Sequence, residues 1–110
     1  MDRVSSESLN RLYRVILDLK TIEECYDFFE DLCTIKELRD LSARLDVAFL
    51  LDRGLSYQAV AGETGVSSAT ICRVKKCLDY GSGGYRRAID RAAAEEKQEK
   101  ESHGTQRNAI

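Results

Sequence analysis

Small polar and basic side chains gather in one segment of the chain, residues 67–76, which has the sequence SSATICRVKK. Hydroxyl, guanidinium and ammonium groups of this kind contact the phosphates and base edges of nucleic acids. Catalysis would need other partners, such as a histidine beside a nucleophile or a pair of carboxylates in a cleft. The single histidine, His103, lies far along the chain in a polar segment, and no cofactor-binding loop is present. We therefore expect a binding protein rather than an enzyme, with no cofactor.

The spacing of apolar residues around this segment predicts a helix-turn-helix over residues 56–78. Ser56 would cap a short first helix that ends at Gly65, which can adopt the left-handed conformation. Ser67 would cap a second helix, and Gly81 fits the C-cap of that helix. A short turn crosses two helices steeply, so their apolar or small positions must bury against each other. Those positions are Val60, Ala61, Val66, Ile71 and Val74.

The second helix must then turn its remaining residues outward. The residues expected on that outward face are Ser68, Ala69, Cys72 and Arg73. The face is small and polar at its N-terminal end and basic behind, as a helix that enters the major groove of DNA requires. A plain helical hairpin with a glycine in its turn would show the same spacing, and this second interpretation stays open.

The four cysteines do not form a metal-binding pattern. They are Cys25, Cys33, Cys72 and Cys77, and none belongs to a CxxC pair. A structural zinc site usually needs closer pairing. We expect no metal site and no disulfide, and we assign Cys25 and Cys33 to one apolar helix face.

Charge is distributed unevenly, although the net charge is only −2. Residues 1–52 hold 12 acidic and 7 basic side chains, whereas residues 65–91 hold 6 basic and 2 acidic ones. A basic segment beside an acidic body is typical of a surface that faces phosphates. A solvated helix face would carry similar charges, so charge alone does not decide the function.

Apolar residues recur at helical spacing along the chain, strand-type alternation is hard to find and proline is absent, which predicts an all-α fold. Dimerisation helices are expected within residues 5–53. Ser5 or Ser6 can cap the first of them, and capping boxes at residues 21–24 and 34–37 start the other two. A C-terminal helix is expected over residues 84–94. Residues 1–94 would form one domain, and residues 95–110 a polar, frayed tail.

The end of the third expected helix, residues 47–51 (VAFLL), is apolar nearly all round. A helix of this kind is buried on several sides. Three helices and a small helix-turn-helix provide too few packing partners within one chain to cover this segment on all sides. We therefore expect a homodimer in which a second copy supplies them, and a self-sufficient monomeric bundle is the alternative.

Two signals concern the location of the protein. No stretch of about 18 apolar residues occurs, so no membrane span is expected. The N-terminal residues lack the apolar region of a secretory signal. We therefore expect the protein in the cytoplasm, with no membrane partner.

The segment that follows the turn resembles the Trp-repressor superfamily, and within it the YerC/YecD-type branch. The family's recognition helix carries an Ala-Thr-Ile-x-Arg core, present here at residues 69–73. Residues 80–85 resemble the Tyr-Gly-x-Gly-Gly-Tyr tail of the YerC branch. The resemblance covers about residues 35–90, and it implies a six-helix all-α fold, an intertwined homodimer and two DNA-binding heads.

The resemblance also implies roles for individual residues. Those that would face base edges are Ser68, Ala69, Thr70 and Cys72. Those that would contact phosphates are Gln58, Ser67 and Lys76. Arg73 falls where the Trp repressor uses an arginine beside its bound tryptophan, so it belongs both to the DNA-binding set and to a candidate effector pocket. The other members of that pocket are Arg44, Val74 and Cys77.

The candidate pocket departs from the Trp repressor at two positions. The Trp repressor has a glycine after the arginine, which leaves room for the indole, whereas this chain has Val74. The second arginine, which clamps the carboxylate, corresponds to Ala43 in an ungapped alignment, with Arg44 adjacent. A filled indole space and a missing cation both argue against tryptophan. We expect no response to tryptophan and leave an unknown small-molecule effector open.

These observations favour a sequence-specific, repressor-like transcriptional regulator that binds double-stranded DNA as a homodimer. The alternative is a protein-interaction module that keeps the helix-turn-helix as a scaffold, which the negative net charge and the acidic tail favour slightly. An exposed apolar patch on the second helix would indicate a protein partner, and a basic patch across both heads would indicate DNA.

Overall fold

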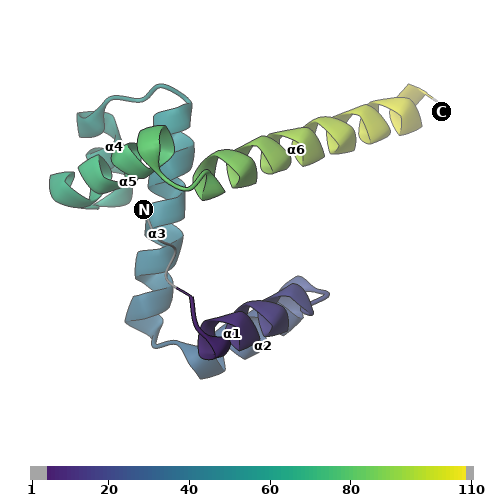
Figure 1. The fold of residues 1–110 in the computed structure, drawn as a ribbon. Coiled ribbons are helices and arrows are strands. Elements are labelled where there is room, and N and C mark those ends of the chain that lie inside the picture. The colour runs from purple at the N-terminus through teal and green to yellow at the C-terminus, as the bar shows by residue number, and fades with distance from the viewer. Residues whose placement is uncertain (1–4, 109–110) are drawn as a thin grey trace. The chain divides into compact units, whose positions relative to one another are not determined.

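The computed structural model describes the backbone of residues 5–108 and the side chains of residues 5–101. Within these residues the chain forms six α-helices and no strand (Figure 1), which confirms the expected all-α fold. The helices are α1 (Glu7–Leu17), α2 (Ile22–Leu32), α3 (Ile35–Asp52), α4 (Tyr57–Thr64), α5 (Ser68–Tyr80) and α6 (Gly84–Asn108).

The chain divides into two compact units between residues 40 and 41. The first unit holds α1, α2 and the start of α3, and the second holds the rest of α3 with α4, α5 and α6. The expectation that residues 1–94 form one domain stays a prediction.

Side-chain caps start the helices of the first unit where the sequence placed them. The hydroxyl of Ser6 accepts a backbone N–H of α1 at 3.1 Å. Thr21 and Glu24 cap α2 reciprocally. At the start of α3, the carboxylate of Glu37 accepts the N–H of Thr34 at 2.8 Å, and the Thr34 hydroxyl accepts the N–H of Glu37 at 3.1 Å. Each cap satisfies N–H groups that have no partner within the helix.

Helices α1 and α2 bury none of their side chains completely. Large apolar side chains stay exposed on these helices and at the start of α3. They are Tyr13, Val15, Leu17, Ile22, Tyr26, Leu32 and Ile35, which we call the apolar surface of the first unit. Short helices gain most of their stability from packing of an apolar face. The single chain leaves these apolar side chains largely uncovered.

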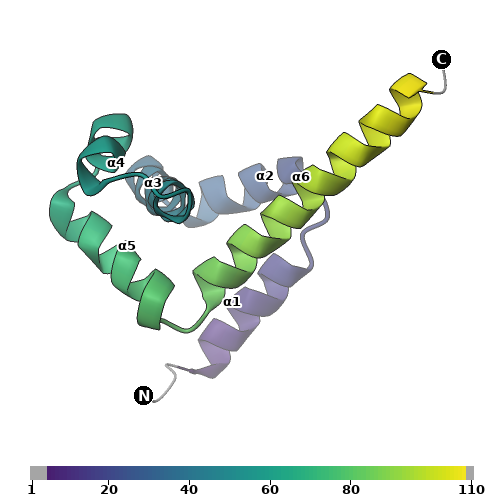
Figure 2. The same ribbon diagram turned by 90° about the horizontal axis from the view of Figure 1, so that it is seen from above.

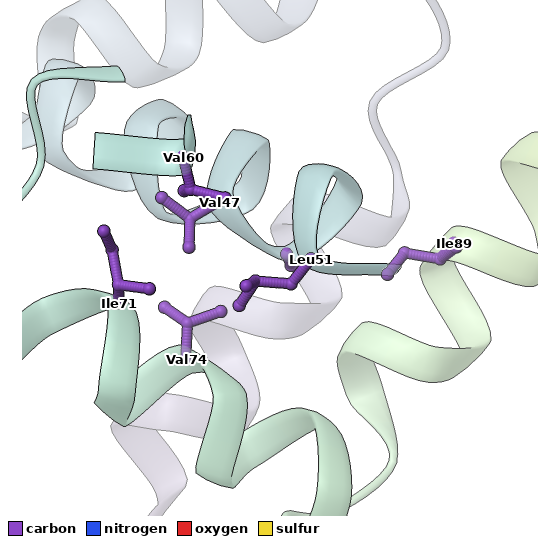
Figure 3. Close-up of a cluster of buried hydrophobic side chains, with 7 residues drawn as sticks. Val47, Leu51, Val60, Ile71, Val74 and Ile89 are labelled. Atoms are coloured by element: carbon purple, nitrogen blue, oxygen red, sulfur yellow. The ribbon is translucent and has the colours of Figure 1, made fainter. Parts of the chain in front are cut away.

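The hydrophobic core lies in the second unit and is built around the apolar end of α3. Figure 2 looks nearly along α3 and shows α4, α5 and the start of α6 grouped around it. Side chains from all four helices converge in Figure 3. The buried residues are Val47, Ala48, Leu51, Val60, Ile71, Val74 and Ile89. Complete burial of one such aliphatic side chain contributes about 1.5–3 kcal/mol, so this cluster fixes α4 and α5 against α3.

Helix α6 is longer than the sequence predicted. It starts at Gly84, as expected, but it continues beyond residue 94 to Asn108, so the expected frayed tail is a helix in the described residues. Residues 95–101 (EEKQEKE) lack apolar side chains, which suggested fraying. Glu, Lys and Gln nevertheless have high helix propensity, and Glu96 and Lys100 stand four residues apart in the favourable order. In Figure 1 this part of α6 extends past the core of the second unit.

Arg86 joins the start of α6 to the end of α3. Its guanidinium pairs with the carboxylate of Asp52 and, at 3.6 Å, with that of Asp90 one turn further along α6. An exposed ion pair contributes about 1 kcal/mol or less, so the burial of Ile89 is the stronger anchor of α6.

The turn between α5 and α6 needs a glycine at residue 81 for reasons of space. Gly81 is the C-cap of α5, as predicted, and its N–H donates to the Cys77 carbonyl at 2.9 Å. Its φ of −81° is open to any residue. A Cβ at this position would lie 2.4 Å from that carbonyl oxygen, which no larger residue can accept without a shift of the backbone.

Candidate nucleic-acid interface

Helices α4 and α5 form the helix-turn-helix that the sequence predicted, joined by residues 65–67. The hydroxyl of Ser56 caps α4 by accepting a backbone N–H at 3.1 Å. Gly65 ends α4 in the left-handed conformation, with φ 70° and ψ 9°. The hydroxyl of Ser67 caps α5 by accepting the N–H of Thr70 at 3.3 Å. The local turn chemistry therefore confirms the sequence prediction at each of these positions.

The hydroxyl of Thr64 adds a connection that the sequence analysis missed. It donates to the carbonyl of Val60 at 2.7 Å and accepts the N–H of Val66 at 3.2 Å. It therefore ties the last turn of α4 to the residue after Gly65. The available signal was a threonine directly before the turn glycine, because threonine hydroxyls commonly bond to neighbouring backbone groups at helix ends.

The inward face of the motif is packed as predicted. Val60 and Ile71 are fully buried, and Val74 is 2% exposed. Ala61 and Val66 are half-buried and pack against the same core cluster. The position of α5 relative to α4 is therefore fixed by aliphatic contacts.

The outward face of the motif carries most of the residues that the sequence analysis assigned to DNA. The residues that are exposed are Gln58, Ser67, Ser68, Ala69, Cys72, Arg73 and Lys76. Their exposure follows from the helical period, because the residues between them face the core. We call the α5 residues of this set, residues 68, 69, 72, 73 and 76, the outer face of α5.

Thr70 differs from the other assigned residues. It is half-buried, and the Ser67 hydroxyl donates to its hydroxyl oxygen at 3.1 Å. The two hydroxyls therefore hold each other at the start of α5. Thr70 supports the cap, and less of it is available to a ligand than its sequence position suggested.

The basic side chains near the motif differ in how they are engaged. Lys75 pairs with Asp79 one turn later on α5, at 3.3 Å, so their charges offset each other. Arg73 and Lys76 form no ion pair with any described residue. The outer face of α5 therefore keeps two uncompensated positive charges behind its small polar residues.

The four residues of the candidate effector pocket lie in different environments. Val74 belongs to the core, and Arg73 and Cys77 are exposed on α5. Arg44 is half-buried on α3, within the second unit. The valine side chain thus occupies core volume next to Arg73, and the pocket stays a prediction.

The described residues offer neither a metal site nor a membrane span. No group of His, Cys, Asp or Glu side chains in that part of the chain could hold a metal ion. None of the described helices has both the length and the apolar character that crossing a membrane requires.

Known proteins resemble this chain in sequence and in fold. The family model described as Trp repressor protein matches residues 7–93. The uncharacterized protein YerC of Bacillus subtilis (strain 168) is 50% identical over 91 residues, which cover 83% of this chain and 88% of YerC.

Two solved structures resemble this chain in fold as well. The crystal structure of a TrpR-like protein from Eubacterium eligens ATCC 27750 superposes with a TM-score of 0.78 at 44% identity, covering 80% of this chain and 91% of that one. The crystal structure of a protein described as a Trp repressor from Staphylococcus aureus also superposes with a TM-score of 0.78. It is 43% identical, and the match covers 81% of this chain and 89% of that one. The chain therefore belongs to the Trp repressor protein family, a family of helix-turn-helix regulators that are not enzymes.

Proposed function

We propose that this protein is a sequence-specific transcriptional regulator that binds double-stranded DNA, with α5 as its recognition helix. The observation that carries the proposal is the outer face of α5. It begins with the exposed small residues Ser68 and Ala69 and continues with exposed, unpaired Arg73 and Lys76. Small residues let a helix approach base edges closely, and cations neutralise the phosphates on either side.

The assigned roles follow from position along α5. Ser68, Ala69 and Cys72 would face base edges, because they stand in the first turns of the helix and are exposed. Thr70 would act mainly by holding Ser67, since the two hydroxyls are bonded to each other. The residues assigned to phosphates are Gln58, Ser67 and Lys76, with Arg73 on either phosphate or guanine.

A homodimer completes the proposal. The apolar surface of the first unit exposes seven large side chains that a second copy of the same surface would cover. Burial of apolar area is the dominant favourable term in such an association. Two heads would then place two copies of α5 in successive major grooves, about 34 Å apart on a pseudo-palindromic site. A regulator of this kind would act in the cytoplasm, as the sequence suggested.

The outer face of α5 favours DNA over a protein partner. A protein-interaction module would present an exposed apolar patch on this helix. Among the large apolar side chains of α5, all of which the structure describes, Tyr80 alone is strongly exposed, and it is the last residue of the helix. The rest of the exposed surface of α5 is small, polar or charged.

The proposal is tested by fluorescence anisotropy with a labelled random-sequence duplex at several salt concentrations, followed by selection from a random duplex library. We expect an affinity that falls steeply with salt, because counterions are released from the phosphates. We also expect the enriched sites to show two-fold symmetry. No binding at low salt would contradict the proposal.

A matched pair of variants identifies the surface. Arg73→Ala and Lys75→Ala remove the same charge from neighbouring positions of α5, but only Lys75 is already paired with an acid. We expect Arg73→Ala to weaken binding by about tenfold or more, as removal of one good DNA-binding side chain does, and Lys75→Ala to have a much smaller effect. Equal effects of both variants would show that binding senses only net charge and would remove Arg73 from the interface.

A further inference from the structure

Tyr80 is the most exposed large apolar residue in the described part of the chain, with 88% of its surface accessible. It closes α5 and precedes the Gly81 cap. A tyrosine combines an apolar ring with a hydroxyl that seeks a hydrogen-bond partner, which makes it frequent at interfaces. None of the roles assigned above uses it.

Tyr80 lies on the outer side of α5. Lys76 stands four residues before it and Arg73 seven residues before it, so the three side chains follow one another along a single helix face. The nearest acid on this helix, Asp79, is paired with Lys75 at 3.3 Å. Tyr80 therefore ends a stripe whose other members are unpaired cations. Such a stripe suits a polyanion better than it suits a second copy of the same cationic surface.

The length of α5 decides which part of DNA Tyr80 can reach. An α-helix rises about 1.5 Å per residue, so Tyr80 stands about 16 Å along the axis from Ala69. The major groove is about 8.5 Å deep. When α5 enters the groove with its N-terminal end first and Ala69 lies at the base edges, Tyr80 at the other end of the helix lies outside the groove, where the sugar–phosphate backbone is the part of DNA within its reach.

We propose that Tyr80 contacts the DNA backbone, with its hydroxyl donating to a phosphate oxygen and its ring packing on the adjacent sugar. The inference rests on the proposed function and adds to it a contact that sets the tilt of α5. Backbone contacts position a protein on the duplex without distinguishing sequences. Tyr80 therefore raises the affinity for a selected site and for random DNA by the same factor.

The test compares full-length wild type, Tyr80→Phe and Tyr80→Ala by anisotropy on a selected site and on a random duplex. Tyr80→Phe removes only the hydroxyl, and we expect it to weaken binding to both duplexes by about tenfold for the two heads together, with a larger effect for Tyr80→Ala. The salt slope should stay unchanged because no charge is removed. Lys76→Ala should instead reduce that slope by about 1 for each phosphate that the protein no longer neutralises.

The control is Ser8→Ala, which removes an exposed hydroxyl from α1, outside the apolar surface of the first unit and outside α5, and should leave binding unchanged. Unchanged affinity of both Tyr80 variants would overturn the inference and leave the proposed function standing. Weaker binding confined to the selected site would overturn it as well, because Tyr80 would then distinguish sequences. So would weaker binding that follows dissociation of the dimer in sedimentation velocity. Absence of DNA binding by wild type would overturn the proposed function and this inference with it.

Discussion

The side-chain oxygen of Thr64 lies 2.7 Å from the carbonyl oxygen of Val60, one turn earlier in α4, and its hydroxyl donates across that distance. The same oxygen accepts the N–H of Val66 at 3.2 Å. One hydroxyl thus spans the left-handed residue Gly65 and connects α4 with the approach to α5. The hydroxyl therefore adds to the aliphatic contacts that hold the two helices together, from a half-buried position outside the outer face of α5.

We expect Thr64→Val to lower the free energy of unfolding by about 1 kcal/mol, because it preserves the shape of the side chain but leaves the Val66 N–H without its partner. Urea denaturation followed by circular dichroism measures this change. Thr64→Ser keeps the hydroxyl and serves as the control, which should retain most of the stability. A valine variant as stable as wild type would show that solvent satisfies the Val66 N–H equally well.

Two glycines of α4 and its turn should respond to alanine in opposite directions. Gly65 has φ 70°, and a Cβ there would meet no atom within 4 Å, so the cost of Gly65→Ala is the left-handed backbone alone, about 1–2 kcal/mol. Gly62 lies inside α4 with equally open space and should gain up to about 1 kcal/mol from Gly62→Ala. Thermal unfolding of the two variants measures this difference: the midpoint temperature should fall for Gly65→Ala and rise for Gly62→Ala, relative to wild type. Two variants that both destabilise the protein would contradict it.

Local features of the fold could be predicted from the sequence because they depend on residues a few positions apart. Thr21, Thr34, Ser56 and Ser67 cap the helices where expected, since each cap joins a hydroxyl to an N–H within three residues. The exposure of the outer face of α5 follows from helical periodicity in the same way. The predicted end of α6, at residue 94, differs from the structure because the residues that follow it lack apolar side chains but have high intrinsic helix propensity.

The parts of the site that escaped prediction depend on three-dimensional proximity or on competition between hydroxyls. Arg86 and Asp52 are 34 residues apart and meet only because α6 packs beside the end of α3. Thr70 was expected at base edges, yet its hydroxyl is engaged by Ser67. The helical period predicts the direction of a side chain, but it does not predict which neighbouring residue forms a hydrogen bond with its polar group.

The carboxylate of Glu37 should titrate below its ordinary value of about 4.5. Hydrogen bonds from the Thr34 backbone N–H, and then from the Thr34 side chain, favour the charged form and lower the pKa. A lowered pKa in the folded state stabilises the cap above the unfolded-state value, and this contribution disappears as the pH falls through the folded-state value. The start of α3 should therefore loosen in acid below about pH 4.5.

The measurement is an NMR titration of the Glu37 side-chain carboxyl carbon. Thr34→Val removes the hydroxyl and keeps the backbone N–H, so it should bring the pKa part of the way back toward the ordinary value. A Glu37 carboxyl that titrates at or above that value in wild type would show that the capping box does not persist in solution.

Tryptophan should neither bind this protein nor change its affinity for DNA. Val74 is 2% exposed within the core, so its side chain occupies volume next to Arg73 that a glycine would leave free. Moving it aside would open a cavity in the core, and the loss of even one buried methylene group, as in an isoleucine-to-valine change, costs about 0.5–1.5 kcal/mol. In addition, the carboxylate of a bound tryptophan would face Ala43, where the Trp repressor has a second arginine. Isothermal titration with tryptophan, with and without the selected duplex, should show no binding heat. Micromolar binding would mean that Arg44 supplies the missing cation and that α5 moves away from the core when the ligand enters.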